Sequence, residues 1–268
     1  RFKDKIFIRG FLITSSTEVD ETQYPFYGNW ERKDIENLNF YVHKKQTVYV
    51  HSGTNGTWFL IGHAYNPFTM QYKEDEILEV LANIKEGDQF EYINQLTGLF
   101  VMGQIKENEI ILLSDCASMQ IVYYGKIKDD IYISSHMQLI GDLCDLEQDE
   151  YVKELVRYKR YRLYGPFLPG DLSEYKEIKR VVPNTFVRYS NSSFSVRRFY
   201  PAKKLEMVSE EKEYNQLIKE ACGILNRSMK LISQKWGHPA ISMTGGMDLQ
   251  VHAPIVCMKN LNILAIFQ

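Results

Sequence analysis

The sequence contains few cysteines and no long apolar run. The four cysteines, Cys116, Cys144, Cys222 and Cys257, are far apart and form no C-x-x-C pair. This spacing favours a reduced interior and argues against a disulfide framework or a zinc site. No apolar run approaches the roughly 18 residues that a transmembrane helix needs, and the run after the basic residues 1–5 is too short for a signal peptide. We expect a cytoplasmic protein without a membrane partner.

An excess of charge of one sign is also missing. The 32 basic and 34 acidic residues give a net charge of −2, so nothing in the charge favours nucleic acid or an acidic membrane as a partner. Tyrosines and arginines alternate over residues 157–164, but such interleaving is more often a solvated or interdomain helix face than a base-stacking surface. The six histidines are scattered without H-x-x-x-H spacing, so we expect no histidine metal site.

The chain is long enough for two domains. With 268 residues, of which 44% are hydrophobic and 25% charged, it can bury a large core. Residues 203–212 are rich in charge, as in a linker between domains. We therefore expect one domain over residues 1–203 and the beginning of a second over residues 204–268.

The first 200 residues carry mainly strand patterns. Short β-branched and aromatic runs that alternate with turn residues predict an antiparallel sheet. Strands are predicted over residues 5–14, 39–51, 58–63, 98–103, 109–113, 121–124, 131–135 and 194–200, and a turn that leads into a strand is predicted over residues 181–189. Apolar residues at helical spacing predict further elements. Helices are predicted over residues 74–83, 89–96, 137–143 and 149–160.

Near the end of the chain a β-type run breaks into a glycine pair beside a carboxylate. The residues concerned are Ser242, Thr244, Gly245, Gly246 and Asp248. Glycine lets the backbone approach an anion closely, and the N–H groups of a turn that opens into a helix carry partial positive charge. The pattern predicts a site for the phosphates of ATP, with the hydroxyl group of Ser242 or Thr244 as a donor and Asp248 as a ligand of Mg²⁺.

The surroundings of the glycine pair decide between this interpretation and a plain turn, which an isolated Gly-Gly more often is. A helical pattern over residues 213–230 precedes the pair, and a second β-type run over residues 262–267 follows it. The order helix, strand, glycine turn, helix, strand is typical of a βαβ nucleotide-binding unit. The context therefore favours the phosphate-binding interpretation.

Several segments in the same order resemble motifs of the asparagine synthetase family. Residues 97–102 resemble a Gly-x-Phe strand, residues 114–124 resemble an Arg-Asp-x-x-Gly segment that ends in Tyr-Tyr, and residues 134–136 resemble Ser-Ser-Glu. Residues 178–184 resemble a turn before the last strands of the family's first domain. Residues 244–248 resemble the pyrophosphate loop S-G-G-x-D-S. The resemblance implies an α+β chain. It implies a four-layer αββα domain of the N-terminal-nucleophile type, a class II glutamine amidotransferase fold, followed by the start of an α/β ATP-pyrophosphatase domain.

The chain also departs from that family. Working amidotransferase domains begin with a cysteine whose thiol attacks glutamine, and no cysteine occurs here before Cys116. The resemblance therefore implies a degenerate glutaminase domain, similar in this respect to β-lactam synthetase. Leu249 replaces the serine of the pyrophosphate loop, which removes one phosphate donor. A full adenylating domain would continue past a first βαβ unit, so we expect the second domain to be incomplete.

Two other residues, His63 and Asp115, are interpreted in the light of this resemblance. His63, close to Asn66, could line the former glutamine pocket, although a histidine at a hairpin end is more often structural. Asp115 matches a family position that supports the sheet, and we expect it to cap a turn.

Two functions remain. In one, the protein is an ATP-dependent amide-forming ligase that works through an acyl-adenylate, with a small-molecule carboxylate and an amine as substrates. In the other, both centres have decayed and the chain is a binding or scaffold protein, which Leu249 favours. The sequence is compatible with a homodimer but carries no signal for one.

Overall fold

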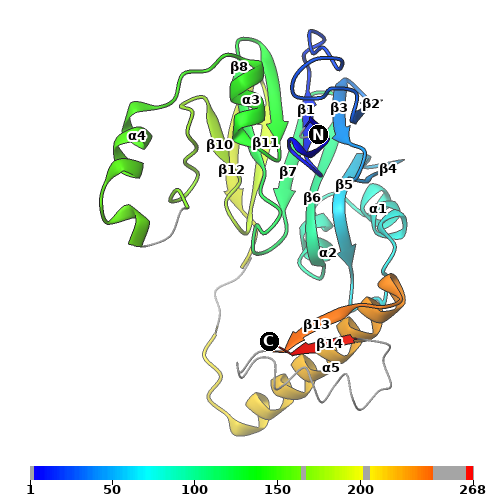
Figure 1. Cartoon of the computed structure of the whole chain (residues 1–268). Coiled ribbons are helices and arrows are strands. Elements are labelled where there is room, and N and C mark those ends of the chain that lie inside the picture. Colours follow the sequence, from blue (N-terminus) through cyan, green and yellow to red (C-terminus); the bar gives the residue numbers. More distant parts are fainter. Residues whose placement is uncertain (1–2, 164–166, 202–205, 244–263, 268) are drawn as a thin grey trace.

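Two antiparallel sheets form most of the computed structural model (Figure 1). The structure describes residues 3–163, 167–201, 206–243 and 264–267. The described helices and strands include two short 3₁₀ turns, η1 (Lys3–Lys5) and η2 (Tyr161–Leu163). A third, two-stranded sheet lies with a long helix at the end of the molecule away from α3 (Met137–Leu143). None of the described helices is long and apolar enough to cross a membrane.

The first sheet has six strands, and every neighbouring pair is antiparallel. In spatial order they are β10 (Ile178–Arg180), β8 (Tyr123–Ile127), β9 (Asp130–Ser134), β1 (Phe11–Thr14), β3 (Leu38–His43) and β2 (Trp30–Ile35). At one edge, β2 exposes the consecutive side chains of residues 31–34, which are all charged.

The second sheet also has six antiparallel strands. In spatial order they are β12 (Ser193–Arg198), β11 (Thr185–Ser190), β7 (Glu109–Ser114), β6 (Thr97–Lys106), β5 (Gly56–Tyr65) and β4 (Val48–Gly53). Edge strand β12 is exposed along most of its length and ends in Arg197 and Arg198.

The main core lies between the two sheets. Phe40 of the first sheet meets Phe59 of the second edge to face, with 5.1 Å between the ring centroids, and both rings are fully buried. Phe59 and Ile61 belong to this core, whereas Trp58 and Leu60 belong to the cluster on the other face of the second sheet. The period of two along β5 therefore buries both faces of the sheet.

Helices cover the outer faces of both sheets. The helices α1 (Glu74–Asn83) and α2 (Gln89–Ile93) pack on Trp58 and Leu60 of the second sheet. Leu139 and Ile140 of α3 pack on Leu12 and Tyr41 of the first sheet. The expected arrangement of two stacked sheets between helices is therefore confirmed for this part of the chain.

The last described elements are α5 (Glu211–Trp236), β13 (Ala240–Met243) and β14 (Leu264–Phe267). The strands β13 and β14 are parallel, with Ala240 opposite Leu264 and Met243 opposite Phe267. The expected helix and the two β-type runs around the glycine pair are thus confirmed as elements. Residues 244–263, which connect the strands, lie outside the described residues, and the structure does not show an ATP-pyrophosphatase domain.

Two strand predictions were wrong in their extent. Lys5 ends η1 and residues 6–9 form a turn, so β1 begins only at Phe11: Phe7 and Arg9 have positive φ, and the amide of Gly10 donates to the carbonyl of Phe7. The single strand predicted over residues 39–51 is two strands, β3 and β4, which lie in different sheets. The amide of Gln46 donates to the carbonyl of His43 in the turn between them, at 2.7 Å.

Helix α4 (Glu150–Arg157) is shorter than predicted because it is bounded by local contacts. The Asp149 carboxylate accepts a hydrogen bond from the amide of Tyr151 at 2.8 Å, which caps the first turn. At the other end Tyr158 is extended, and its amide bonds to the carbonyls of Glu154 and Leu155.

Candidate functional site

The predicted phosphate site begins at the end of β13. Ser242 lies in that strand, opposite Ile266 of β14. Thr244, Gly245, Gly246 and the predicted metal ligand Asp248 lie outside the described residues. Along the chain these four residues follow the carboxyl end of β13 directly, which is where ligands bind in parallel α/β sheets.

The start of β1 is the place where the resemblance would put an amidotransferase nucleophile. A Cβ atom at Gly10 would lie 2.6 Å from the Phe7 carbonyl oxygen and 3.2 Å from the Ser135 hydroxyl, so the backbone here is closely packed. The hydroxyl of Ser135 accepts a hydrogen bond from the Phe11 amide at 3.0 Å. The three described cysteines, Cys116, Cys144 and Cys222, all lie elsewhere.

A serine–histidine contact at this position was missed by the sequence analysis. The Ser135 hydroxyl lies 2.8 Å from His136 Nδ1, and the His136 ring lies 4.9 Å from the ring of Phe7. Burial lowers the pKa of His136, which favours the neutral imidazole. Because the main chain of Phe11 also binds the Ser135 hydroxyl, we interpret the pair as a structural link between β1 and β9.

Asn66, directly after β5, is held by hydrogen bonds to its own loop and to Gln95. Its carbonyl oxygen accepts from the amides of Phe68 and Thr69, and its amide nitrogen donates to Gln95. The side chain is completely buried. Neighbouring His63 is half exposed, and its Nδ1 lies 3.6 Å from the Glu74 carboxylate.

A buried ion pair joins α5 to the second sheet and α1. Lys235 Nζ lies 2.7 Å from Glu74 Oε1, and the two side chains are only 9% and 6% exposed. The same ammonium group donates to the main-chain carbonyls of Ala64 and Tyr72. Trp236 packs against His63, with 5.6 Å between the ring centroids. The contacts tie the end of a helix to a site 161 positions earlier in the chain.

Asp115 caps a turn, as predicted. Its Oδ1 accepts from the amides of Ala117 and Met119, and its Oδ2 accepts from the amide of Gln120 at 2.8 Å. The residue is 2% exposed. Three hydrogen bonds to one buried carboxylate hold the turn that follows β7.

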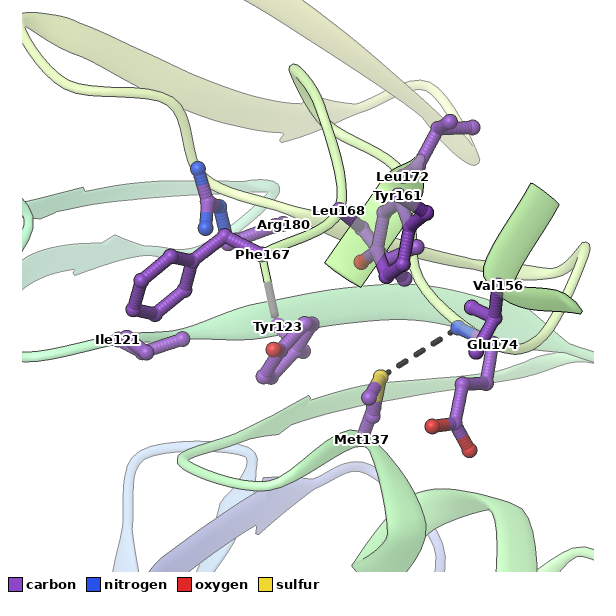
Figure 2. A pocket seen from close by; sticks show the side chains of 10 residues that line it. All are labelled: Ile121, Tyr123, Met137, Val156, Tyr161, Phe167, Leu168, Leu172, Glu174 and Arg180. Atoms are coloured by element: carbon purple, nitrogen blue, oxygen red, sulfur yellow. Dashed lines mark hydrogen bonds between the residues drawn. The ribbon is translucent and has the colours of Figure 1, made fainter. Parts of the chain in front are cut away.

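A pocket of about 350 Å³ opens beside the edge of the first sheet (Figure 2). Most of its lining is aromatic or aliphatic, and two side chains are charged. The lining residues are Ile121, Tyr123, Met137, Val156, Tyr161, Phe167, Leu168, Leu172, Glu174 and Arg180. Figure 2 shows the Arg180 and Glu174 side chains at opposite ends of the pocket, with Tyr123 and Met137 between them. This site was not predicted from the sequence, because its residues come from separate elements.

Metal ligation by clustered side chains is not indicated in the part of the chain that the structure describes. There, no group of three or more histidine, cysteine or acidic side chains is placed to hold a metal ion. Asp248, the predicted magnesium ligand, is not among the residues searched.

Comparisons with known proteins give only distant matches. No family model and no curated protein matches the chain. One similar solved structure is glutamine phosphoribosylpyrophosphate amidotransferase from B. subtilis in complex with ADP and GMP, at 11% identity and a TM-score of 0.41 over 97% of this chain. Another is an allosteric regulatory enzyme of purine biosynthesis, at 11% identity and a TM-score of 0.43 over 75% of this chain.

The chain spans 59% and 44% of the length of those two structures. At such identities and TM-scores, neither match establishes the fold or the activity of this chain.

Proposed function

We propose that the protein is an ATP-dependent ligase that forms an amide bond. One observation carries the proposal: the Thr-Gly-Gly-Met-Asp sequence of residues 244–248 directly follows β13, and β13 is paired in parallel with β14. Parallel neighbours need a crossover connection, and the carboxyl ends of such strands are the usual place for nucleotide phosphates. The resemblance to the asparagine synthetase family supports the choice of reaction.

The proposed roles follow from the chemistry of each group. The amides of Gly245 and Gly246 bind phosphate oxygens, the hydroxyls of Ser242 and Thr244 donate to them, and Asp248 holds Mg²⁺. A substrate carboxylate oxygen attacks the α-phosphorus of ATP, and pyrophosphate leaves. An amine then attacks the acyl carbon and gives up a proton to solvent, and AMP leaves with the bonding electron pair. The protein contributes positioning and charge stabilisation to both steps.

The proposal includes no glutaminase. At the start of β1 a glycine is packed against the Phe7 carbonyl, and the sequence has no cysteine before Cys116. We propose that the amine comes from solution or from another protein. We place the reaction in the cytoplasm, where ATP is present and the free thiols of Cys116 and Cys222 stay reduced.

A second candidate function is a scaffold that has lost nucleotide chemistry. Leu249 favours it, because the family loop carries a hydroxyl donor at that position. The parallel strands would then serve packing alone, and a partner protein would take the place of substrates.

Binding of Mg²⁺-ATP to the full-length protein tests the proposal. We expect a rise in Tm that depends on ATP concentration, because a ligand that binds only the folded state stabilises it by about 2.7 kcal/mol at a hundredfold excess over Kd. Asp248→Asn should remove most of the rise. Asp129→Asn, in the turn before β9, is the matched control and should keep it.

Two further measurements separate the candidates. Leu249→Ser restores the missing donor and should tighten ATP binding by about tenfold if the turn holds phosphate. AMP should form from ATP when ammonia and a pool of small carboxylic acids are supplied. If ATP does not raise the Tm, Leu249→Ser changes nothing and no AMP forms, the ligase proposal is wrong and the scaffold function takes its place.

A further inference from the structure

One end of the pocket in Figure 2 is lined by the polar side chains of Arg180 and Tyr123. The side chains of Arg180 and Tyr123 lie on the same face of the first sheet, because the two residues are directly opposite each other in the antiparallel pair β10–β8. Arg180 Nε is buried, and it has no hydrogen-bond partner among the residues that the structure describes. The Arg180 side chain lines the pocket, so an anionic ligand there would give its guanidinium group a charge-assisted contact.

The rest of the pocket is apolar and partly uncovered. Phe167 and Val156 line it and are 71% and 41% exposed, so large apolar surfaces face solvent at its mouth. A volume of about 350 Å³ falls within the range of small-molecule sites. An apolar ligand body would remove these side chains from water, which favours binding.

Tyr123 can donate a hydrogen bond to the ligand, and Glu174 limits the negative charge that the ligand can carry. Burial raises the pKa of Tyr123, so its hydroxyl keeps its proton at neutral pH and can donate to an anion near Arg180. Glu174 is at the end of the pocket away from Arg180, where a second negative group would be repelled.

From this arrangement we propose that the pocket binds a small monocarboxylate with an aromatic or branched apolar body. The carboxylate pairs with Arg180 and accepts from the Tyr123 hydroxyl, and the body lies on Met137, Leu172 and Val156. None of the lining residues belongs to the proposed ATP site, so this binding does not depend on the ligase function.

Calorimetry with 3-phenylpropanoate tests the proposal on the unaltered chain. The neutral analogue 3-phenylpropanol has the same body without the charge, and succinate has two charges without the apolar body. We expect the carboxylate to bind at least about tenfold more tightly than the alcohol, and succinate not to bind, because a charge-assisted contact contributes a factor of this order. Equal binding of carboxylate and alcohol, or no binding of the carboxylate, would overturn the proposal.

Substitutions in and near the pocket test whether 3-phenylpropanoate binds there. Arg180→Met should weaken binding of 3-phenylpropanoate at least about tenfold. Lys179→Met is the matched control, because it removes a positive charge from the same strand, where Lys179 pairs with Asp171 outside the pocket. It should leave the affinity within about twofold. Val156→Trp enlarges a half-exposed side chain at the mouth, so it should block binding while Tm stays near that of the unaltered chain. Unchanged affinity in Arg180→Met or in Val156→Trp would show that the ligand binds elsewhere.

Discussion

The charge of His136 is governed by its burial. Burial lowers the pKa of the imidazole in the folded protein, whereas in the unfolded chain it titrates near its ordinary value. The folded state therefore binds fewer protons between the two pKa values. Stability is complete above the unfolded pKa and is lost as the pH falls through the unfolded pKa toward the lower, folded one.

We expect the free energy of unfolding to fall between about pH 7.5 and about pH 5, with His136 contributing to the fall. His136→Gln removes the titrating group and should make the decrease smaller. His51→Gln in the hairpin of β4 and β5 is the comparison for a general loss of histidine. Urea denaturation at a series of pH values measures the effect, and an identical slope in His136→Gln and the unaltered protein would contradict it.

Single residues also mark what the sequence could and could not predict. The turn-capping role of Asp115 was predictable because an aspartate that directly follows a strand finds nearby main-chain amides. The role of Lys235 was not, since a lysine on a helix is normally solvated and Glu74 is far away in the sequence. The place of Arg180 in a pocket was not predictable either, because the residues that line this pocket are spread over positions 121–180.

Secondary-structure elements were predicted best where their signals are local. Helix α1 has the predicted bounds, because Ile77, Leu78, Leu81 and Ala82 repeat at helical spacing and are all buried. The hairpin of β4 and β5 followed from its turn residues. The division between β3 and β4 was missed although the polar residues 43–47 interrupt the alternation, and the change of sheet depends on distant partners.

The pairing of β5 with β6 depends on two glycines with positive φ. Gly62 has a φ of +111° and Gly98 a φ of +137°, and a Cβ at either position would lie 2.2 Å or 2.1 Å from a main-chain oxygen of the other strand. The sheet therefore requires glycine for two reasons, a backbone conformation that other residues rarely adopt and a close approach of backbones.

Gly98→Ala should lower the free energy of unfolding by more than about 3 kcal/mol, because strain and a backbone clash add. Gly87→Ala separates the two effects. Gly87 has a φ of +103°, but no atom lies within 4 Å of its added Cβ, so only the strain of about 1–3 kcal/mol should appear. Chemical denaturation compares the variants, and equal losses would show that the clash at Gly98 is relieved by movement of the strand.

For the chain taken together, the Lys235–Glu74 pair is a buried link between the two parts proposed over residues 1–203 and 204–268. Removal of one member leaves a buried charge without its partner, which costs about 3–5 kcal/mol in buried ion pairs. Lys235→Met and Glu74→Gln should each weaken the attachment of α5, and the double variant should lose less than the sum of the two.

Limited proteolysis within the exposed residues 206–210 and urea denaturation together measure this attachment. Lys230→Met on the exposed face of α5 is the control, and it should behave like the unaltered protein. If the single variants are cut no faster and the double variant shows additive losses, the pair does not hold the two parts together.

The outer strands of the two sheets have a consequence for the behaviour of many copies at high concentration. A strand with an open side can pair with the same strand of another molecule and begin a fibril. Here β2 presents residues 31–34, all charged, and β12 ends in two arginines. Such pairing would strip water from those charges. The protein is therefore protected against amyloid-like assembly at these two borders by charged side chains that lie outside its core.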